Sequence, residues 1–472
     1  MRPYLPHFNR ALGAQVAMFA VLLFCGSITA QVQTTADHAS WQPLFDGKTL
    51  NGWERHGGAG SYEVVDDMIV GTSVDTRTNT FLTTKEKYDD FIFECEVRLP
   101  SILNSGVMFR AQLREEDDRI FGYQFEIDPG ARAWTGGIYD EARRKWVYPL
   151  TYNESARSAF RLGAWNRIRI EALGQELRTY VNGTMVSRLI DDVDARGVFG
   201  LQVHGVYRPE DVGLQVMWRD IRILTENVAQ HRLSPDPGVR EVSMLTNNTL
   251  TDYERRHGWR MLWDGKGTTG WRGAKLDGFP ERGWTINDGV LTIEATDGGE
   301  STGPGDIVTE QHYGDFELEL QFKITEGANS GIKYFVDPSL NRGSGSAIGC
   351  EFQILDDKRH PDAKAGVLGN RTMGSLYDLI PADNVRYGRG KSVNGPGNWN
   401  HARIVSRDGH VTHYLNGEPV VEYDRFSQTF AALVNYSKYQ QWENFGRWPA
   451  GAILLQDHGN EVSFRGIKIR EL

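Results

Sequence analysis

The segment WQPLFDGKTLNGW, which runs from Trp41 to Trp53, returns in the second half of the chain as WRMLWDGKGTTGW, from Trp259 to Trp271. Both copies place their terminal tryptophans 12 residues apart and keep a central Asp-Gly-Lys. Self-similarity over a long period is the sequence signature of a repeated structural unit. This pair of segments therefore indicates that one domain is written twice.

Further blocks match between the two halves, and they do so in the same order. The pairs are DDFIFECEV (from Asp89) with GDFELELQF (from Gly314), NSGV (Asn104) with NSGI (Asn329), GYQFEID (Gly122) with GCEFQILD (Gly349), YVNGT (Tyr180) with YLNGE (Tyr414), LQVHG (Leu201) with LQDHG (Leu455), and WRDIRI (Trp218) with FRGIKI (Phe464). We expect one domain over residues 38–226, a linker over 227–257 and a second domain over 258–472.

Nearly every matched block alternates apolar and polar residues, as half-buried strands do. The blocks are bounded by Gly, Asn and Asp, and the Asn-Gly pairs at Asn182 and Asn416 are strong hairpin signals. The sequence predicts an all-β protein made of two jelly-roll β-sandwiches. Within the linker, Thr251-x-x-Glu254 is a capping box, which predicts a short helix that ends near Gly258.

The first thirty residues resemble a secretion signal. Arg2 and Arg10 precede an apolar run from Ala14 to Phe24, and small residues lead to a cleavage point after Ala30. We expect an exported protein, periplasmic or extracellular, with no transmembrane anchor after cleavage. A lipid anchor on Cys25 fits less well, because the bulky Phe24 precedes it.

Charge and cysteine usage narrow the function classes further. Without residues 1–30 the chain has 50 basic and 62 acidic side chains, a net charge of −12, so nucleic acid is not an expected partner. Cys95 and Cys350 stand on the apolar faces of strand patterns in different halves. We expect both to be buried free thiols.

The motifs together resemble the 3-keto-disaccharide hydrolase domain family. They are W-x-x-L-F-D-G-K-T-L-x-G-W, N-S-G-I, E-x-Q-I-L-D-D, G-x-W-N, H-x-L-N-G, L-Q-D-H-G and F-R-x-I-x-I. The resemblance covers nearly all of the chain after the leader, twice. It implies a concanavalin-like jelly roll, export in bacteria, and a substrate whose C3 hydroxyl has been oxidised to a ketone, that is, a 3-keto-glycoside.

Such a ketone makes the hydrogen on C2 acidic, because the anion left behind is an enolate. Cleavage can then proceed by proton abstraction at C2, loss of the C1 substituent and addition of water. This route needs a base near C2, a group that polarises the ketone and an acid for the leaving oxygen.

The second repeat carries polar residues that could serve as this base, polarising group and acid. They lie on predicted strands or in the loops that follow them. As acid, base or metal ligand we expect Glu351, Asp356, His360 and His458. Lys333 is the expected polariser, and the residues expected to orient hydroxyl groups are Gln353, Arg359, Tyr377 and Gln456. A divalent metal ion is possible, held by histidine and carboxylate groups from separate strands.

The first repeat departs from this pattern. Val203 stands where the second repeat has Asp457, and nothing matches His360. We expect this half to have an accessory or reduced role. Its predicted substrate-binding residues are Arg110, Gln124, Glu126, Asp128, Tyr139 and His204.

Two other functions remain open at this point. The stretch Ser427–Ala450 is an insertion rich in aromatic residues, and a non-catalytic carbohydrate-binding protein could stack sugars on them. These aromatics are Tyr436, Tyr439, Trp442 and Trp448. A conventional retaining glycosidase is disfavoured, because Glu126 and Asp128 are not followed by the second glutamate that its strand needs.

A few polar residues in the second repeat have more ordinary interpretations. We expect these to support the fold or a turn rather than chemistry: Asp264, Trp399 and Asn400. His413 alternates with Leu415 on a strand, and both a structural histidine and a ligand remain open for it.

Overall fold

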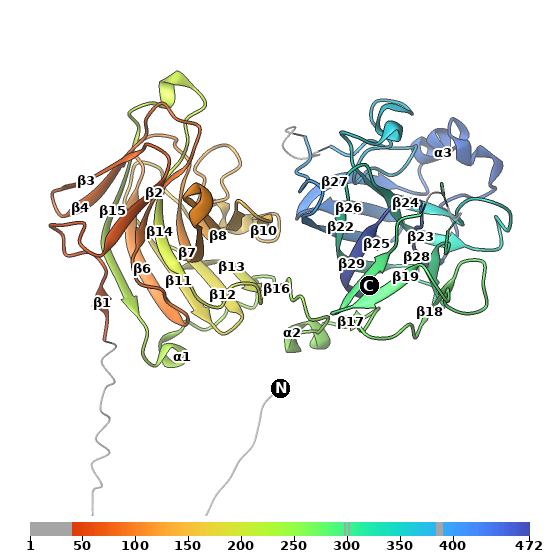
Figure 1. Cartoon of the computed structure of the whole chain (residues 1–472), viewed down its shortest axis with the longest axis horizontal. Coiled ribbons are helices and arrows are strands. Elements are labelled where there is room, and N and C mark those ends of the chain that lie inside the picture. Colours follow the sequence, from red (N-terminus) through yellow and green to blue (C-terminus); the bar gives the residue numbers. More distant parts are fainter. Residues whose placement is uncertain (1–39, 297–298, 301–302, 384–389) are drawn as a thin grey trace, which may run out of the picture. The chain divides into compact units, whose positions relative to one another are not determined.

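The computed structural model of the protein describes residues 40–296, 299–300, 303–383 and 390–472. The predicted leader over residues 1–30, with Cys25, lies outside the described residues. Strands β1–β16 build a first sandwich and strands β17–β29 a second, and each sandwich consists of a larger and a smaller sheet (Figure 1). The all-β prediction is confirmed.

The first sandwich is assembled mainly from antiparallel pairs. Its larger sheet has the order β16 (Val242–Ser243), β13 (Thr184–Ile190), β12 (Glu176–Val181), β11 (Asn166–Leu173), β6 (Phe91–Arg98), β15 (Gln215–Leu224), β4 (Met68–Thr72) and β3 (Ser61–Val65), with β1 (Gln42–Pro43) beside β15. Its smaller sheet has the order β10 (Lys145–Tyr148), β9 (Ile138–Glu141), β8 (Arg119–Ile127), β7 (Ser105–Arg114), β14 (Val198–Val203), β5 (Thr80–Thr84) and β2 (Trp53–Gly57).

The second sandwich repeats this plan. Its larger sheet has the order β19 (Trp284–Asn287), β20 (Val290–Ile293), β29 (Val462–Glu471), β22 (Phe316–Ile324), β25 (Trp399–Arg407), β26 (His410–Leu415) and β27 (Glu418–Asp424), with β17 (Arg260–Met261) beside β29. Its smaller sheet has the order β18 (Trp271–Gly273), β21 (Ile307–Thr309), β28 (Ala452–Leu455), β23 (Asn329–Asp337) and β24 (Ile348–Leu355).

Helix is sparse in both halves. The α-helices are α1 (Val228–His231), α2 (Asp252–Arg256) and α3 (Gln428–Asn435). Short 3₁₀ turns occupy Glu115–Asp117, Glu154–Ser158, Pro209–Asp211, Pro361–Lys364 and Lys438–Gln441. In the described part of the chain, no helix combines the length and the apolar character that a membrane crossing requires.

Each hydrophobic core lies between the two sheets of its sandwich. In the first, the ring of Phe93 on β6 stacks 4.6 Å from that of Phe199 on β14. In the second, Phe322 on β22 meets Phe352 on β24 edge to face at 6.4 Å. Aromatic pairs at such distances add to the stabilisation that comes from apolar burial. The alternating strands therefore turn one side chain in two into these interiors and present the other set on the opposite face of each sheet.

The predicted turns and the helix cap are confirmed. Asn182 and Asn416 adopt positive φ angles of 50° in the hairpins β12–β13 and β26–β27. Thr251 Oγ1 accepts from the Glu254 amide at 3.1 Å, and Glu254 answers by accepting from the Thr251 amide at 2.9 Å. Asp264 closes its turn by accepting from two backbone amides, at 2.8 and 2.9 Å.

The remaining structural expectations are also confirmed. Cys95 and Cys350 are buried free thiols. Asn400 is buried and ties the chain before β25 to that strand, since its side chain bonds both the amide and the carbonyl of Asn394. His413 is buried between Tyr334 Oη at 2.7 Å and the Gly374 carbonyl at 3.0 Å, and burial lowers its pKa to about 4.

Candidate active site

The smaller sheet of the second sandwich carries a buried ion pair. Lys333 on β23 stands opposite Glu351 on β24, and Nζ lies 3.6 Å from Oε2. Both side chains are almost fully buried. Alternation places Gln353 on the same face of β24 as Glu351. The predicted grouping of these three residues on one sheet face is therefore present.

Close packing across the sheet explains why the Asn-Ser-Gly segment at the start of β23 needs its glycine. A Cβ atom at Gly331 would lie 2.1 Å from Oε1 of Glu351, far inside van der Waals contact. The Glu351 carboxylate thus occupies the space that a side chain on β23 would take. The same relation holds in the first sandwich, where a Cβ at Gly106 would lie 2.5 Å from the Gln124 side chain.

Glu300 completes the environment of this ion pair, and sequence reasoning missed it. Its Oε1 accepts from Gln456 Nε2 at 3.0 Å and lies 3.9 Å from Lys333 Nζ. Glu300 belongs to a loop with no strand periodicity, so no local pattern marked it. Gln456, which LQDHG did mark, is brought to the group by the end of β28.

Lys438 is the second residue that the sequence did not single out. It comes from the aromatic insertion, and its Nζ lies 4.3 Å from the ring centroid of Tyr377. The Tyr377 hydroxyl donates to Asp362 Oδ2 at 2.8 Å, and Arg371 braces Asp362 at 3.0 Å. The insertion thus delivers an ammonium group to the predicted site, beside the predicted Tyr377.

The charges of this group shift one another's pKa values. Burial raises the pKa of Glu351, and the neighbouring Lys333 and Lys438 offset only part of that effect. Burial alone would also raise the pKa of Glu300, but Lys333, Lys438 and His458 reverse the shift and lower it. Burial lowers the pKa of Lys438. A buried carboxyl with a raised pKa beside two lysines is typical of functional sites.

Both predicted histidines lie beside this group. The rings of His360 and His458 meet edge to face, 6.0 Å between centroids. Burial, together with the charge of His458, lowers the pKa of His360. His458 is close enough to Glu300 for its charge to act on that carboxylate. His360 Nδ1 also accepts from the Asp362 amide at 3.2 Å, which fixes its ring.

Two predicted site residues are engaged elsewhere. Asp356 is buried in the turn after β24, where Oδ2 accepts from the Gly327 amide at 2.9 Å and Oδ1 from the Lys358 amide at 3.1 Å. Arg359 pairs with the exposed Glu326 at 2.8 Å and with Asp356 at 3.3 Å. These contacts hold a loop together, so the structure gives both residues a structural task.

Asp457 of LQDHG also stabilises a loop. It accepts from the amides of Gly305 and Gly459, each at 2.9 Å, and its own amide donates to Asp306 at 2.9 Å. This network places Gln456 and His458, its neighbours in sequence, on the site. Asp457 in LQDHG thus stabilises a loop through hydrogen bonds that Val203, at the matching place in LQVHG, cannot form.

In the first sandwich, a cavity lies over the corresponding face of the smaller sheet. Four of the predicted residues line it, namely Gln124, Glu126, Tyr139 and His204, together with Asn104 and Gln202. Both oxygens of Glu126 accept side-chain amide hydrogens at 2.6 Å, one from Asn104 and one from Gln124. Burial raises the pKa of Glu126 to about 7, although Arg132 and Asn104 act in the opposite direction.

The other two predicted residues of this half lie apart from that cavity's polar floor. Asp128 caps the turn after β8 and pairs with Arg132 at 2.7 Å. Arg110 is fully buried, and its guanidinium donates to the carbonyls of Asp89 and Gly174, each at 2.8 Å. The sequence-based assignment of Arg110 to substrate binding is corrected, because loop carbonyls and Asp90 take up its donors.

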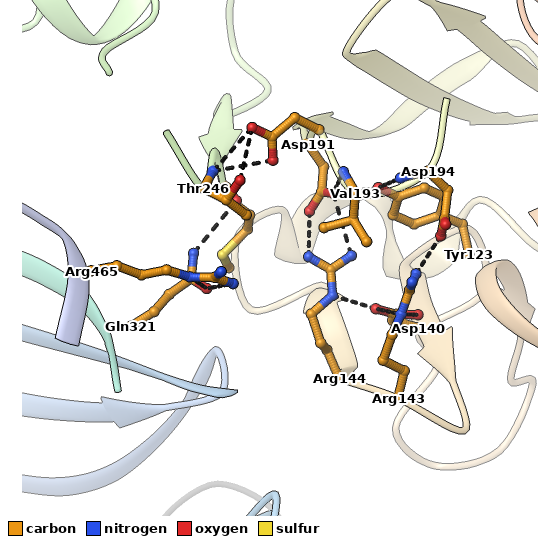
Figure 2. Close-up of polar contacts among 12 residues, drawn as sticks. Tyr123, Asp140, Arg143, Arg144, Asp191, Val193, Asp194, Thr246, Gln321 and Arg465 are labelled. Carbon is orange, nitrogen blue, oxygen red and sulfur yellow. Dashed lines mark hydrogen bonds and ion pairs between the residues drawn. The ribbon is translucent and has the colours of Figure 1, made fainter. Parts of the chain in front are cut away.

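A buried ion network holds β9 in place under the cavity. Figure 2 shows Arg144 between Asp140 and Asp191, and Arg143 between Asp140 and Asp194. Asp140 follows Tyr139 on β9, so it faces away from the cavity that Tyr139 lines. The network therefore fixes the strand that presents Tyr139.

Most of the aromatic insertion packs inward. Tyr439 is buried and stacks on Phe445 at 4.0 Å, and Trp442 and Trp448 pack against the core, whereas Tyr436 is exposed. A sugar-stacking platform of several exposed rings, as the carbohydrate-binding alternative requires, is not formed by this set. In the described residues, no three His, Cys, Asp or Glu side chains gather in an arrangement suited to a metal ion. The divalent ion stays a prediction.

Several known proteins are similar to parts of this chain. A 3-keto-disaccharide hydrolase of Bacteroides thetaiotaomicron is 34% identical over 239 residues, which cover 46% of this chain and 79% of that protein. A crystal structure of a putative glycosyl hydrolase from Parabacteroides distasonis is 29% identical, covers 48% of this chain and 99% of its own, and gives a TM-score of 0.41. A carbohydrate-binding module from Bacillus subtilis is 16% identical over 37% of this chain and 95% of its own, with a TM-score of 0.25.

The family match runs through both halves. Residues 40–224 and residues 258–470 each match the 3-keto-alpha-glucoside-1,2-lyase-like domain. The resemblance inferred from the motifs is thereby confirmed. The chain belongs to the family of 3-keto-alpha-glucoside-1,2-lyase-like domain proteins and contains two copies of that domain.

Proposed function

We propose that the protein hydrolyses the glycosidic bond of 3-keto-glycosides, and that it does so at the second sandwich. Family membership and the relative named a 3-keto-disaccharide hydrolase support the substrate class. The observation that carries the location is the buried pair of Lys333 and Glu351, with Glu300, Lys438 and the two histidines around it. This group of residues combines a carboxylate that can accept the C2 proton with two ammonium groups that can stabilise the enolate.

Glu351 is the proposed base for the C2 proton. In its ionised form it accepts that proton, and the electrons of the C2–H bond move to form the enolate of the 3-ketone. Its raised pKa makes it a stronger base than an exposed glutamate, and Lys333 keeps a usable fraction ionised.

Lys333 and Lys438 stabilise the negative charge that develops on the ketone oxygen. Lys333 is almost fully buried, Lys438 is exposed on the insertion, and both stand close enough to Glu351 to lower its pKa. A fixed positive charge in a site with little water stabilises a developing oxyanion more than it would in solution. Removal of a lysine should therefore slow proton abstraction itself.

The histidine pair serves the leaving group. The enolate collapses, the C1–O bond breaks and the aglycone oxygen takes a proton, which we assign to His458 with His360 beside it. Water then adds to C1 of the resulting enone and gives its proton to His458, while Glu351 returns a proton to C2, so both residues regain their starting forms and the net reaction is hydrolysis. An imidazole can both donate and accept a proton through its ring nitrogens, which suits transfer in both directions.

Neutral polar groups hold the sugar. Gln353 and Gln456 are buried on the same sheet face, and the Oε1 atom of each accepts no hydrogen bond from a described residue. Substrate hydroxyl groups can donate to them. Tyr377, braced by Asp362, lines the same group from a loop.

We also propose export, on the strength of the leader-like residues 1–30. The native protein isolated from its cells would then begin at Gln31, which N-terminal sequencing or intact mass would show. A native chain that keeps residues 1–30 would contradict this proposal.

The activity is tested with a matched pair of substrates, p-nitrophenyl 3-keto-α-glucoside and p-nitrophenyl α-glucoside. We expect nitrophenol release above the enzyme-free rate from the oxidised compound alone. Release from the unoxidised compound would indicate an ordinary glycosidase, and binding of the oxidised compound without release would indicate a lectin; either result overturns the proposal. A parallel assay with a chelator measures any requirement for a divalent ion.

A further inference from the structure

The cavity of the first sandwich is a built polar site that the proposed reaction does not use. Its floor is formed by side chains from β8, from β14 and from the residue that precedes β7: Gln124, Glu126, Gln202 and Asn104. Tyr139 and His204 line it as well. Gln124 and Gln202 are each only 1% exposed, and Glu126 is 5% exposed. Such burial separates this floor from an ordinary solvated sheet face.

The floor presents hydrogen-bond acceptors that the protein leaves unmatched. Gln124 Nε2 donates to Glu126, and a carboxylate can only accept, so Oε1 of Gln124 is the free end of that amide. The Oε1 atoms of Gln124 and Gln202 accept no hydrogen bond from any residue in the described part of the chain. An unmatched buried acceptor destabilises the fold, because it has lost its hydrogen bonds to water. Groups that donate hydrogen bonds are therefore the ligands that this floor favours.

The floor differs from the second sandwich at the position of the catalytic lysine. Met108 stands opposite Gln124 on β7 and β8, just as Lys333 stands opposite Glu351. Arg132, the cation that acts most strongly on Glu126, pairs with Asp128 at 2.7 Å and lies over the rings of Trp134 and Trp146. Further basic residues that line the cavity are Arg77, Arg119 and Lys145.

This arrangement is poor for a ketone and good for a hydroxyl. A ketone oxygen accepts hydrogen bonds and cannot donate one, so over Gln124 it would face an unmatched acceptor and Met108, where the second sandwich offers Lys333. A secondary hydroxyl donates and accepts. A site whose buried polar groups stay unpaired rejects an analogue that lacks the matching hydroxyl.

We propose that the cavity of the first sandwich binds an unoxidised hexose glycoside, whose hydroxyl groups donate to Gln124, Gln202 and Glu126. The chain then holds the parent sugar at one sandwich and cleaves the 3-keto sugar at the other. This binding site goes beyond the proposed reaction and does not depend on it.

Equilibrium binding of methyl α-glucoside to the mature chain, followed by calorimetry, tests the proposal. The matched variants are Gln202→Met and Gln456→Met, which remove the corresponding amide from each sandwich at nearly constant shape. We expect wild type and Gln456→Met to bind the glycoside at millimolar concentrations. Gln202→Met should raise Kd at least tenfold and should leave turnover of the p-nitrophenyl 3-keto-α-glucoside unchanged.

The outcomes are distinguishable. Absence of binding by the wild-type chain overturns the proposal, and so does binding that is lost in Gln456→Met but kept in Gln202→Met. A preference of the Gln202-dependent site for methyl 3-keto-α-glucoside over the parent compound would overturn it too. If Gln202→Met does not fold, as judged by its thermal transition, Gln124→Met replaces it with the same expected loss. The binding result stands whether or not turnover is observed.

Discussion

The two sandwiches place the same strand blocks around their smaller sheets, yet they exchange one pair of residues. The first has Gln124 followed two positions later by Glu126, and the second has Glu351 followed by Gln353. Because strand side chains alternate, a shift of two positions keeps the carboxylate on the same face. The shift changes the partner of the carboxylate instead. Glu126 accepts hydrogen bonds from two side-chain amides, whereas Glu351 forms an ion pair with Lys333. The chemistry of each face is thus set by its neighbour across the ladder.

Replacement of the catalytic carboxylate should have the largest effect. In Glu351→Gln, which copies Gln124 of the first sandwich, turnover of the 3-keto substrate should fall by about 10³–10⁴-fold, because no base remains at C2. Initial rates at saturating substrate measure this. Glu422→Gln, on an exposed position of β27, is the control and should keep the wild-type rate. Comparable loss in both variants would contradict the assignment.

Lys333→Met copies Met108 and should lower turnover by about 10²–10³-fold, since one of the two charges that stabilise the enolate is removed. The lysine lowers the pKa of Glu351, so its removal should raise that pKa. The base is then ionised only at higher pH, and the acidic limb of the pH profile should move upward. If the acidic limb of the pH profile did not move, Lys333 would not control the pKa of Glu351, and the comparison with Met108 would fail.

Glu126 should make folding stability depend on pH in the first sandwich. Its pKa rises from 4.5 to about 7 on folding, so the folded state binds the proton more tightly. The wild type should therefore lose stability as pH rises from about 5 to 8, by up to about 3 kcal/mol. Glu126→Gln removes this component, and Gln353 shows that the scaffold accepts an amide at that place. Chemical denaturation of both proteins at the two pH values measures the free energy of unfolding. If that free energy changed equally with pH in both proteins, the raised pKa of Glu126 would be refuted.

The histidine pair gives a smaller expected effect on catalysis. His458→Ala should lower turnover about 10²-fold for substrates with a poor leaving group, because the departing oxygen then lacks its acid. With p-nitrophenolate, which leaves readily, the loss should be much smaller. His410→Ala, on an exposed position of β26, serves as control. An equal loss for both leaving groups would assign His458 to a different step.

Gly331→Ala should produce the mildest loss, about tenfold, because the new Cβ pushes against Glu351 without removing it. Gly106→Ala makes the corresponding change against Gln124 and should weaken binding of methyl α-glucoside while the 3-keto turnover remains. Turnover of the 3-keto substrate and affinity for methyl α-glucoside, measured for both variants, test whether catalysis belongs to the second sandwich and glycoside binding to the first. If Gly106→Ala slowed turnover as much as Gly331→Ala did, the division would fail.

The sequence by itself determined the duplication, the all-β class, the capped helix and the face on which Glu351 and Gln353 stand. These features rest on repeat identity, on period-two alternation and on local hydrogen bonds, all of which are properties of short segments. The same local logic identified the buried cysteines, whereas the structural role of His413 emerged only from its contacts with Tyr334 and Gly374.

Only the tertiary structure decided which side chains meet. Glu300 and Lys438 belong to loops without periodicity, and they reach the Lys333–Glu351 pair only because distant segments fold over the same sheet. Arg110 and Asp356 looked available in the sequence, but non-local carbonyls and amides occupy their polar atoms. Hydrogen-bond partners across a fold leave no trace in local patterns, and so the membership of the site had to come from packing.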